Sequence, residues 1–160
     1  MSHSSGAGRW PPRPRVSSRF YKAHGLGNDY LVFERAEESD RVDATWCATP
    51  GNVARVCHPH RGVGADGIVV VASSERSDVD PAARVSLRMF NPDGGEFERS
   101  GNGLRVLASY LASRDPMLDV IDARVGGAEV RMRIHGRHEG TFDVRSEEHT
   151  SELQSPDHLV

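Results

Sequence analysis

The stretch 89–105 constrains the fold more than any other, because it predicts a strand, a sharp turn and a helix in direct succession. Apolar residues alternate along 85–89, which is typical of a strand with one strongly apolar face. Residues 91–95 (Asn-Pro-Asp-Gly-Gly) predict a turn, since proline presets φ and glycine accepts a positive φ. Leucines and alanines at helical spacing then follow along 104–111, and Asp115-Pro116 ends that predicted helix.

The junction between this strand and this helix can hold a small anion. The first N–H groups of a helix have no partner inside it, and the helix dipole favours negative charge there. Gly101 and Gly103 would let an anion come close to those groups. A simpler interpretation makes Ser100 the N-cap and Asn102 an ordinary first-turn residue, and local spacing alone favours that interpretation.

Three blocks of the sequence resemble motifs of the diaminopimelate epimerase family. Residues 91–105 (the third block) resemble its Asn-x-Asp-Gly-x-x-x-x-x-Cys-Gly-Asn-Gly-x-Arg motif at every fixed position except one, where this chain has Ser100 in place of cysteine. Residues 22–30 (the first block), Lys-Ala-His-Gly-Leu-Gly-Asn-Asp-Tyr, resemble the opening motif of the family. Residues 62–67 (the second block), Gly-Val-Gly-Ala-Asp-Gly, resemble a family block that leads into a core strand.

The second block also fits the pattern G-x-G-x-x-G of dinucleotide-binding sites. Such a site requires the glycines to follow a strand and open a helix. Here a predicted short helix over 52–58 comes before the block, and the apolar run 68–71 follows it as a strand. The order is reversed, so the dinucleotide interpretation fails.

The resemblance implies an α+β fold, in which a mixed or antiparallel sheet wraps around a central helix to form one of two family domains. The pattern predicts further strands over 20–23, 30–33, 118–120 and 130–134, with a polar surface loop over 73–81. The predicted core residues are large apolar or aromatic side chains: Tyr21, Phe33, Leu87, Leu104, Leu107 and Leu111.

Composition changes at both ends of this domain. Residues 1–18 are rich in Ser, Gly, Pro and Arg and predict a disordered tail, which leaves the domain over 19–144. Residues 145–160 resemble nothing in the family and suggest a non-native, adapter-derived tail, with a native disordered tail as the alternative. That tail carries the entire formal net charge of −3.

Because the rest of the chain is neutral, charge gives no reason to expect a nucleic-acid or membrane partner. Cys47 and Cys57 do not suggest a disulfide framework or a metal site, and His58 and His60 flank a proline as ordinary loop residues. The sequence has no apolar run of membrane-spanning length and no signal peptide, so we expect a cytoplasmic protein by elimination.

The resemblance also implies a chemistry that needs neither pyridoxal phosphate nor a metal. In the family, two cysteines exchange the α-proton of diaminopimelate from opposite faces, one as thiolate base and one as thiol acid. By resemblance, Asn28 and Asn91 hold polar groups of the substrate, and Gly101 and Asn102 offer backbone N–H groups to its α-carboxylate. Ser100 takes the position of the first cysteine, although a hydroxyl is a far weaker acid than a thiol.

Three hypotheses follow. The first is a fragment of such an epimerase, inactive alone, because the Cys-Gly-[Ser/Thr]-Gly block of the second domain does not occur in the sequence. Its expected partners are diaminopimelate and that second domain, and the resemblance also allows a homodimer. The second is a non-catalytic amino-acid-binding paralogue. The third is a proline-racemase-like isomerase that uses Ser100, although the Gly-Leu-Gly-Asn-Asp opening argues against it.

Overall fold

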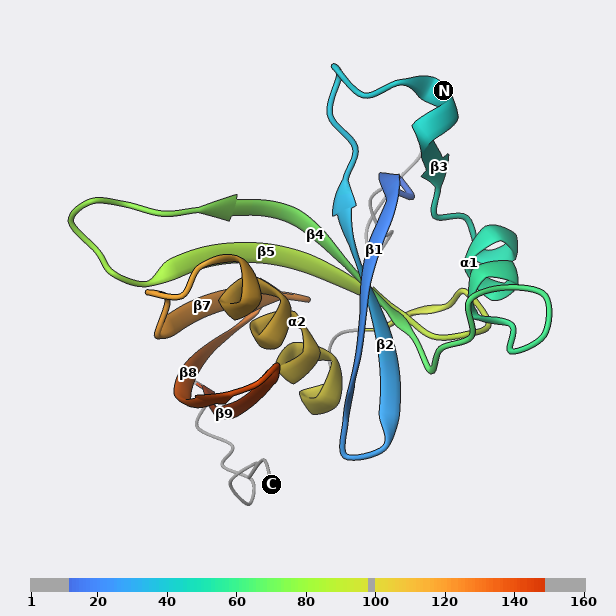
Figure 1. The fold of residues 1–160 in the computed structure, drawn as a ribbon. Helices are drawn as coiled ribbons and strands as arrows, with labels where there is room; N and C mark the ends of the chain where they lie inside the picture. Colours follow the sequence, from blue (N-terminus) through green and yellow to red (C-terminus); the bar gives the residue numbers. More distant parts are fainter. Residues whose placement is uncertain (1–11, 98–99, 149–160) are drawn as a thin grey trace.

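The computed structural model describes residues 12–97 and 100–148, which form one nine-stranded sheet and two α-helices (Figure 1). The strands are β1 (Arg15–Gly25), β2 (Asn28–Arg35), β3 (Thr45–Cys47), β4 (Ile68–Glu75), β5 (Ala83–Phe90), β6 (Glu96–Phe97), β7 (Val120–Val125), β8 (Ala128–His138) and β9 (Thr141–Glu148). The helices are α1 (Pro50–Cys57) and α2 (Gly101–Arg114), with a 3₁₀ turn at Val42–Ala44.

The sheet is mixed and curves around α2. Its strand order is β3-β1-β2-β4-β5-β7-β8-β9, and β6 pairs with β5 beside this path. The pairs β2–β4 and β5–β7 are parallel, and the remaining pairs are antiparallel. Figure 1 shows α2 inside the curve of β5, β7, β8 and β9, while α1 lies away from it on the other side of the sheet. The predicted α+β architecture, with a mixed sheet around a central helix, is confirmed.

Helix α2 begins and ends where the sequence predicts. Ser100 is its N-cap, and its side chain accepts a hydrogen bond from the Gly103 N–H. Asp115 is the C-cap, and its N–H donates to the carbonyl of Leu111. Most of the helix is buried, as its place inside the curved sheet requires. Helix stability therefore comes mainly from packing, because a helix of this length is marginal alone.

The core has two parts, one on each face of the sheet. The larger cluster fills the space between α2 and the curved sheet, and the smaller one lies under α1. Of the predicted core residues, Phe33, Leu87, Leu104, Leu107 and Leu111 are buried, while Tyr21 is half-buried against the larger cluster.

Strand β5 contributes side chains to the core on both faces of the sheet. Met89 points into the larger cluster and Phe90 into the smaller one, and neither is exposed to solvent. Alternation alone would place Phe90 on a polar face, but both faces of the sheet are covered at this end.

Several predicted boundaries differ from the structure. Strand β1 begins at Arg15, inside the predicted tail 1–18, because it pairs with β3 on one side and β2 on the other. Strand β4 takes up the first part of the predicted loop 73–81, and β7 begins only at Val120. Strand β9 was not predicted and continues beyond the expected domain end at 144 to pair with β8. Residues 1–11 and 149–160, which hold the rest of both predicted tails, lie outside the described residues.

Within the described ranges 12–97 and 100–148, neither helix is both long and apolar enough to cross a membrane.

Candidate functional site

The first block forms the tip of the β1–β2 hairpin. Gly25 pairs with Asn28, and the two residues between them, Leu26 and Gly27, have φ values of 53° and 90°. Positive φ at both central positions defines a type I′ turn, which matches the twist of the flanking strands. A Cβ at Gly25 would lie 3.8 Å from the backbone oxygen of Asn102. The hairpin that carries the exposed Asn28 therefore lies beside the first turn of α2.

The second block is tied to the first by a reciprocal pair of hydrogen bonds. The Asp29 N–H donates to Asp66 Oδ2 over 2.8 Å, and the Asp66 N–H donates to the Asp29 carbonyl over 2.8 Å. Lys22 Nζ lies 3.9 Å from Asp29 Oδ2 at the surface. These bonds fix the start of β2 against the loop that leads into β4.

The ring of Tyr30 is the point where all three blocks meet. A Cβ at Gly67 would lie 2.7 Å from Tyr30 Cε1, and a Cβ at Gly103 would lie 3.4 Å from the same atom. The absence of side chains at these two glycines makes the slot that the ring occupies. Tyr30 is only 6% exposed, so its hydroxyl needs a hydrogen-bond partner inside the protein.

Ser100 provides that partner. The Tyr30 hydroxyl donates to Ser100 Oγ over 3.0 Å, and the Gly103 N–H donates to the same oxygen over 3.1 Å. The Ser100 N–H lies 3.2 Å from Met89 Sδ on β5. The interpretation of Ser100 as an N-cap is thus confirmed, and the structure adds an aromatic hydroxyl to the cap.

Asn102 is held from within the helix. Arg105 Nη1 donates to Asn102 Oδ1 over 2.9 Å, and Arg105 is only 6% exposed. A buried guanidinium in this place fixes the amide of Asn102 at the start of α2. Arg105 belongs to the third block, but nothing in the sequence pattern indicated this role.

Asn91 occupies the turn between β5 and β6. Its N–H donates to the Gly95 carbonyl, and the Gly94 N–H donates to the Asn91 carbonyl, both over 2.8 Å. Gly94 has φ of 90°, and a Cβ there would lie 2.3 Å from Pro50 Cα, so the turn packs directly against the start of α1. The turn is confirmed, and Asn91 is exposed at its first position.

A buried ion pair closes the base of this turn. The guanidinium of Arg88 binds the carboxylate of Glu96 through two hydrogen bonds of 2.6 and 2.7 Å. The Glu96 side chain is 3% exposed.

Together, these contacts group Ser100, Gly101 and Asn102 with the Asn28 hairpin. Asn91 is connected to them through β5, whose Met89 lies against the Ser100 N–H.

Cys47 and Cys57 lie on β3 and α1, whereas Ser100 caps α2. Cys57 is buried on α1, and burial, together with the nearby Asp66 carboxylate, raises the pKa of its thiol to about 11. Such a thiol stays protonated near neutral pH. Cys47 lies on β3, where its Sγ is 3.8 Å from the Arg13 carbonyl.

His58 and His60 lie directly after α1, with their ring centroids 6.0 Å apart. His58 Nδ1 accepts hydrogen bonds from the backbone N–H groups of His60 and Arg61, which occupies that nitrogen in the loop. In the part of the chain that the structure describes, no three His, Cys, Asp or Glu side chains are placed to hold a metal ion.

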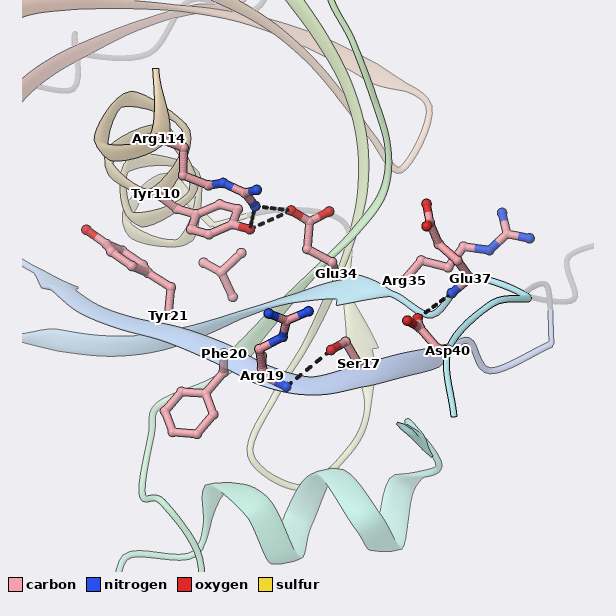
Figure 2. A pocket seen from close by; sticks show the side chains of 11 residues that line it. Ser17, Arg19, Phe20, Tyr21, Glu34, Arg35, Glu37, Asp40, Tyr110 and Arg114 are labelled. Carbon is pink, nitrogen blue, oxygen red and sulfur yellow. Dashed lines mark hydrogen bonds and ion pairs between the residues drawn. The ribbon is translucent and has the colours of Figure 1, made fainter. Parts of the chain in front are cut away.

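A polar cavity of about 420 Å³ lies at the other end of α2 (Figure 2). Its lining residues come from β1, β2, the loop after β2 and α2: Ser17, Arg19, Phe20, Tyr21, Val32, Glu34, Arg35, Glu37, Asp40, Tyr110 and Arg114. Glu34 Oε2 accepts from the Tyr110 hydroxyl over 2.5 Å and from Arg114 Nη1 over 3.0 Å. Burial, followed by the hydrogen bond to Glu34, raises the pKa of Tyr110. This cluster attaches the end of α2 to β2, and nothing in the sequence pattern indicated it.

Comparison with known proteins gives the family of this chain. A model of the family "Diaminopimelate epimerase" matches residues 20–144. The matching proteins are epimerases, a class of isomerases. The chain belongs to the diaminopimelate epimerase family.

Individual relatives agree with the family model. The chain is 43% identical over 95 residues to the diaminopimelate epimerase of Pelotomaculum thermopropionicum, an alignment that covers 59% of this chain and 30% of the relative. It is 38% identical over 119 residues to that of Synechococcus elongatus, covering 74% of this chain and 35% of the relative. The chain thus spans about a third of the length of these relatives.

A solved structure gives a weaker likeness. The phenazine biosynthesis protein of the PhzF family from Bacillus anthracis has a TM-score of 0.46 and 16% identity, covering 85% of this chain and 40% of that one. The family assignment does not depend on it.

Proposed function

We propose that the chain is the N-terminal part of a diaminopimelate-epimerase-type isomerase and supplies half of its substrate site. The observation that carries this proposal is the meeting of the three blocks at Tyr30 and Ser100, beside the first turn of α2. The substrate is diaminopimelate, and the pathway is the synthesis of lysine and peptidoglycan precursors. Neither metal nor pyridoxal phosphate is part of the proposed reaction.

The start of α2 would bind the α-carboxylate of the substrate. The Gly103 N–H is used by the cap, and the Leu104 N–H donates to the Ser100 carbonyl. Gly101 and Asn102 are the first-turn residues whose N–H groups have no acceptor inside the helix. Together with the helix dipole, these two N–H groups favour a bound carboxylate and the charge that builds on it as the α-proton leaves.

Asn28 and Asn91 would hold the remaining polar groups of the substrate. Both are exposed, and both sit on tight turns whose backbone hydrogen bonds fix their positions. The hydrogen bond from Arg105 would keep the Asn102 amide in one orientation at the start of α2.

Ser100 occupies the position of the first acid/base group. A serine hydroxyl is a poor proton abstractor without a neighbouring base, and the donors that reach its oxygen are the Tyr30 hydroxyl and a backbone N–H. We therefore expect weak α-proton exchange on this face of the substrate, with the opposite face served by residues beyond the aligned third of the relatives.

This proposal is tested by joining the chain to the second domain of the Pelotomaculum thermopropionicum relative and measuring deuterium incorporation at the α-carbon of diaminopimelate in D₂O. Ser100→Cys should raise the exchange rate at least tenfold, because a thiol has a pKa near 8.5 and is readily ionised. Ser113→Cys, which adds a thiol near the other end of α2, is the matched control and should change nothing. Equal rates for both variants would contradict the acid/base position of Ser100.

A catalytically inactive amino-acid-binding paralogue is the second candidate. It is favoured by one observation, namely that the oxygen of Ser100 is engaged by two donors. Diaminopimelate binding without deuterium exchange in the Ser100→Cys protein would support this candidate. The family match does not favour it, nor does it favour a proline-racemase-like isomerase.

A further inference from the structure

The hydroxyl of Ser100 has both of its acceptor positions filled. A serine oxygen has two lone pairs and one proton. The Tyr30 hydroxyl and the Gly103 N–H each donate to this oxygen, at 3.0 and 3.1 Å. The proton of Ser100 is then left to donate a hydrogen bond, and the tetrahedral geometry of the oxygen directs it away from both donors.

Neither donor can easily turn away. The Gly103 N–H is fixed by the backbone of α2. The Tyr30 ring is confined between Gly67 and Gly103. The neighbouring Asp29 is tied to Asp66 by two hydrogen bonds, one to the Asp66 carboxylate and one between backbone groups. A tyrosine hydroxyl buried in this way would lose hydration without compensation if it left the serine oxygen.

We propose that Tyr30 is a positioning residue that makes Ser100 a hydrogen-bond donor to a carboxylate oxygen of the ligand. This deepens the proposed function and rests on it, because the ligand is the same amino acid. Ser100 adds a third donor to the N–H groups of Gly101 and Asn102 at the start of α2. The same arrangement makes Ser100 a poor base for the α-proton, since both lone pairs of its oxygen already accept hydrogen bonds.

The two donors also determine what a thiol at this position would do. Hydrogen bonds donated to an ionised group favour its charged form. Ser100→Cys would place a sulfur where the Tyr30 hydroxyl and the Gly103 N–H converge, at the N-terminus of a helix. All three effects stabilise a thiolate.

The first experiment measures the pKa of that introduced thiol from the pH dependence of iodoacetamide alkylation, with each cysteine followed by peptide mass spectrometry. In Ser100→Cys the pKa should lie below the ordinary value of about 8.5. Adding Tyr30→Phe, which keeps the ring and removes only the hydroxyl, should raise it by about one unit.

Tyr21→Phe in the same background is the matched control. The Tyr21 hydroxyl lies 3.3 Å from Ser109 Oγ, so it also connects the hairpin to α2, but away from position 100 (Figure 2 shows Tyr21). It should leave the pKa of the introduced thiol unchanged. An effect of Tyr30→Phe no larger than that of Tyr21→Phe would overturn the positioning role of Tyr30.

The second experiment measures diaminopimelate binding to the unmodified chain by calorimetry. Ser100→Ala and Tyr30→Phe should each weaken binding about ten- to a hundredfold, as expected for one hydrogen bond to a charged group. The double variant should bind as weakly as Ser100→Ala alone, because both changes act through the same proton. Unchanged affinity in Tyr30→Phe would overturn the inference.

Failure of the unmodified chain to bind diaminopimelate would instead contradict the proposed function and the ligand named here. The pKa of the introduced thiol in Ser100→Cys, measured with and without Tyr30→Phe, would still show without any ligand whether the Tyr30 hydroxyl donates to the atom at position 100.

Discussion

Gly67→Ala should destabilise the protein, although it adds a single methyl group. Its Cβ would lie 2.7 Å from Tyr30 Cε1 and 3.0 Å from the Phe90 carbonyl oxygen. Carbon atoms in protein cores are in favourable contact at about 3.5–4.0 Å, so the ring would have to move by roughly 1 Å. It is blocked by the first turn of α2, where Gly103 closes the other side of the slot.

Two opposing contributions set the size of the effect. Overpacking of a core costs about 1–3 kcal/mol. Replacing glycine with alanine restricts the unfolded chain and so stabilises the folded protein by about 0.4–1 kcal/mol where the native φ suits alanine. Gly67 is not among the glycines with positive φ, so this stabilising contribution applies to it. We expect the free energy of unfolding to fall by about 1–2 kcal/mol.

Urea unfolding followed by circular dichroism measures this change, provided that the m-value stays constant. Gly51→Ala is the matched control, since Gly51 lies in α1 and a Cβ there would meet nothing within 4 Å. Its free energy of unfolding should stay equal or rise by up to about 1 kcal/mol. A Gly67→Ala protein as stable as the unmodified chain would refute the close packing of Tyr30 between the blocks.

Two further predictions concern buried ionisable groups. Because burial raises the folded-state pKa of Cys57 from 9.0 to about 11, the folded protein holds this proton more tightly, and stability should fall as pH rises from 9 to about 11, by roughly 2–3 kcal/mol. The raised pKa of Tyr110 acts in the same direction above pH 10, and Cys57→Ala should remove only the earlier part of the loss; identical pH curves would contradict this. Arg88→Met should cost about 3–5 kcal/mol in urea unfolding, because it takes this ion-pair partner from the buried Glu96 carboxylate. Adding Glu96→Gln to Arg88→Met should recover part of the lost unfolding free energy, because it removes the buried negative charge. If the double variant is no more stable than Arg88→Met, the unpaired Glu96 charge is not the cause of the loss.

The strand, turn and helix of the third block could be predicted because their signals are local. Alternation, a proline followed by glycines, and a serine before a helical pattern each act over a few residues. The structure places β5, the turn and α2 where those signals lie.

Strands that form through distant partners were missed. The start of β1 has Val16 as its only large apolar residue between Arg15 and Ser18, yet Val16 is fully buried by pairing with both β2 and β3. Strand β9 likewise depends on β8 and α2, and its own sequence has few apolar residues. Local propensity is weak in such segments, and tertiary contacts decide the outcome.

The candidate site shows the same limit. The sequence indicated that Ser100, Asn102 and Asn28 share a site only through resemblance to a family. It could not show that Gly67 and Gly103 make room for Tyr30, because that contact joins residues far apart in the chain. The roles of Arg105 and of the Tyr110 cluster also depend on such contacts.

The most direct test of the central claim is a ¹H–¹⁵N NMR titration of the chain with meso-diaminopimelate. We predict saturable shifts of the backbone amides of Gly101 and Asn102 and of the side-chain amide of Asn28, with none at Ser113. The diamine 1,5-diaminopentane, which has the same carbon chain without carboxylates, should leave Gly101 and Asn102 unchanged. Shifts confined to the cavity around Arg114, or no saturable shift at all, would contradict the claim that the start of α2 binds the substrate carboxylate.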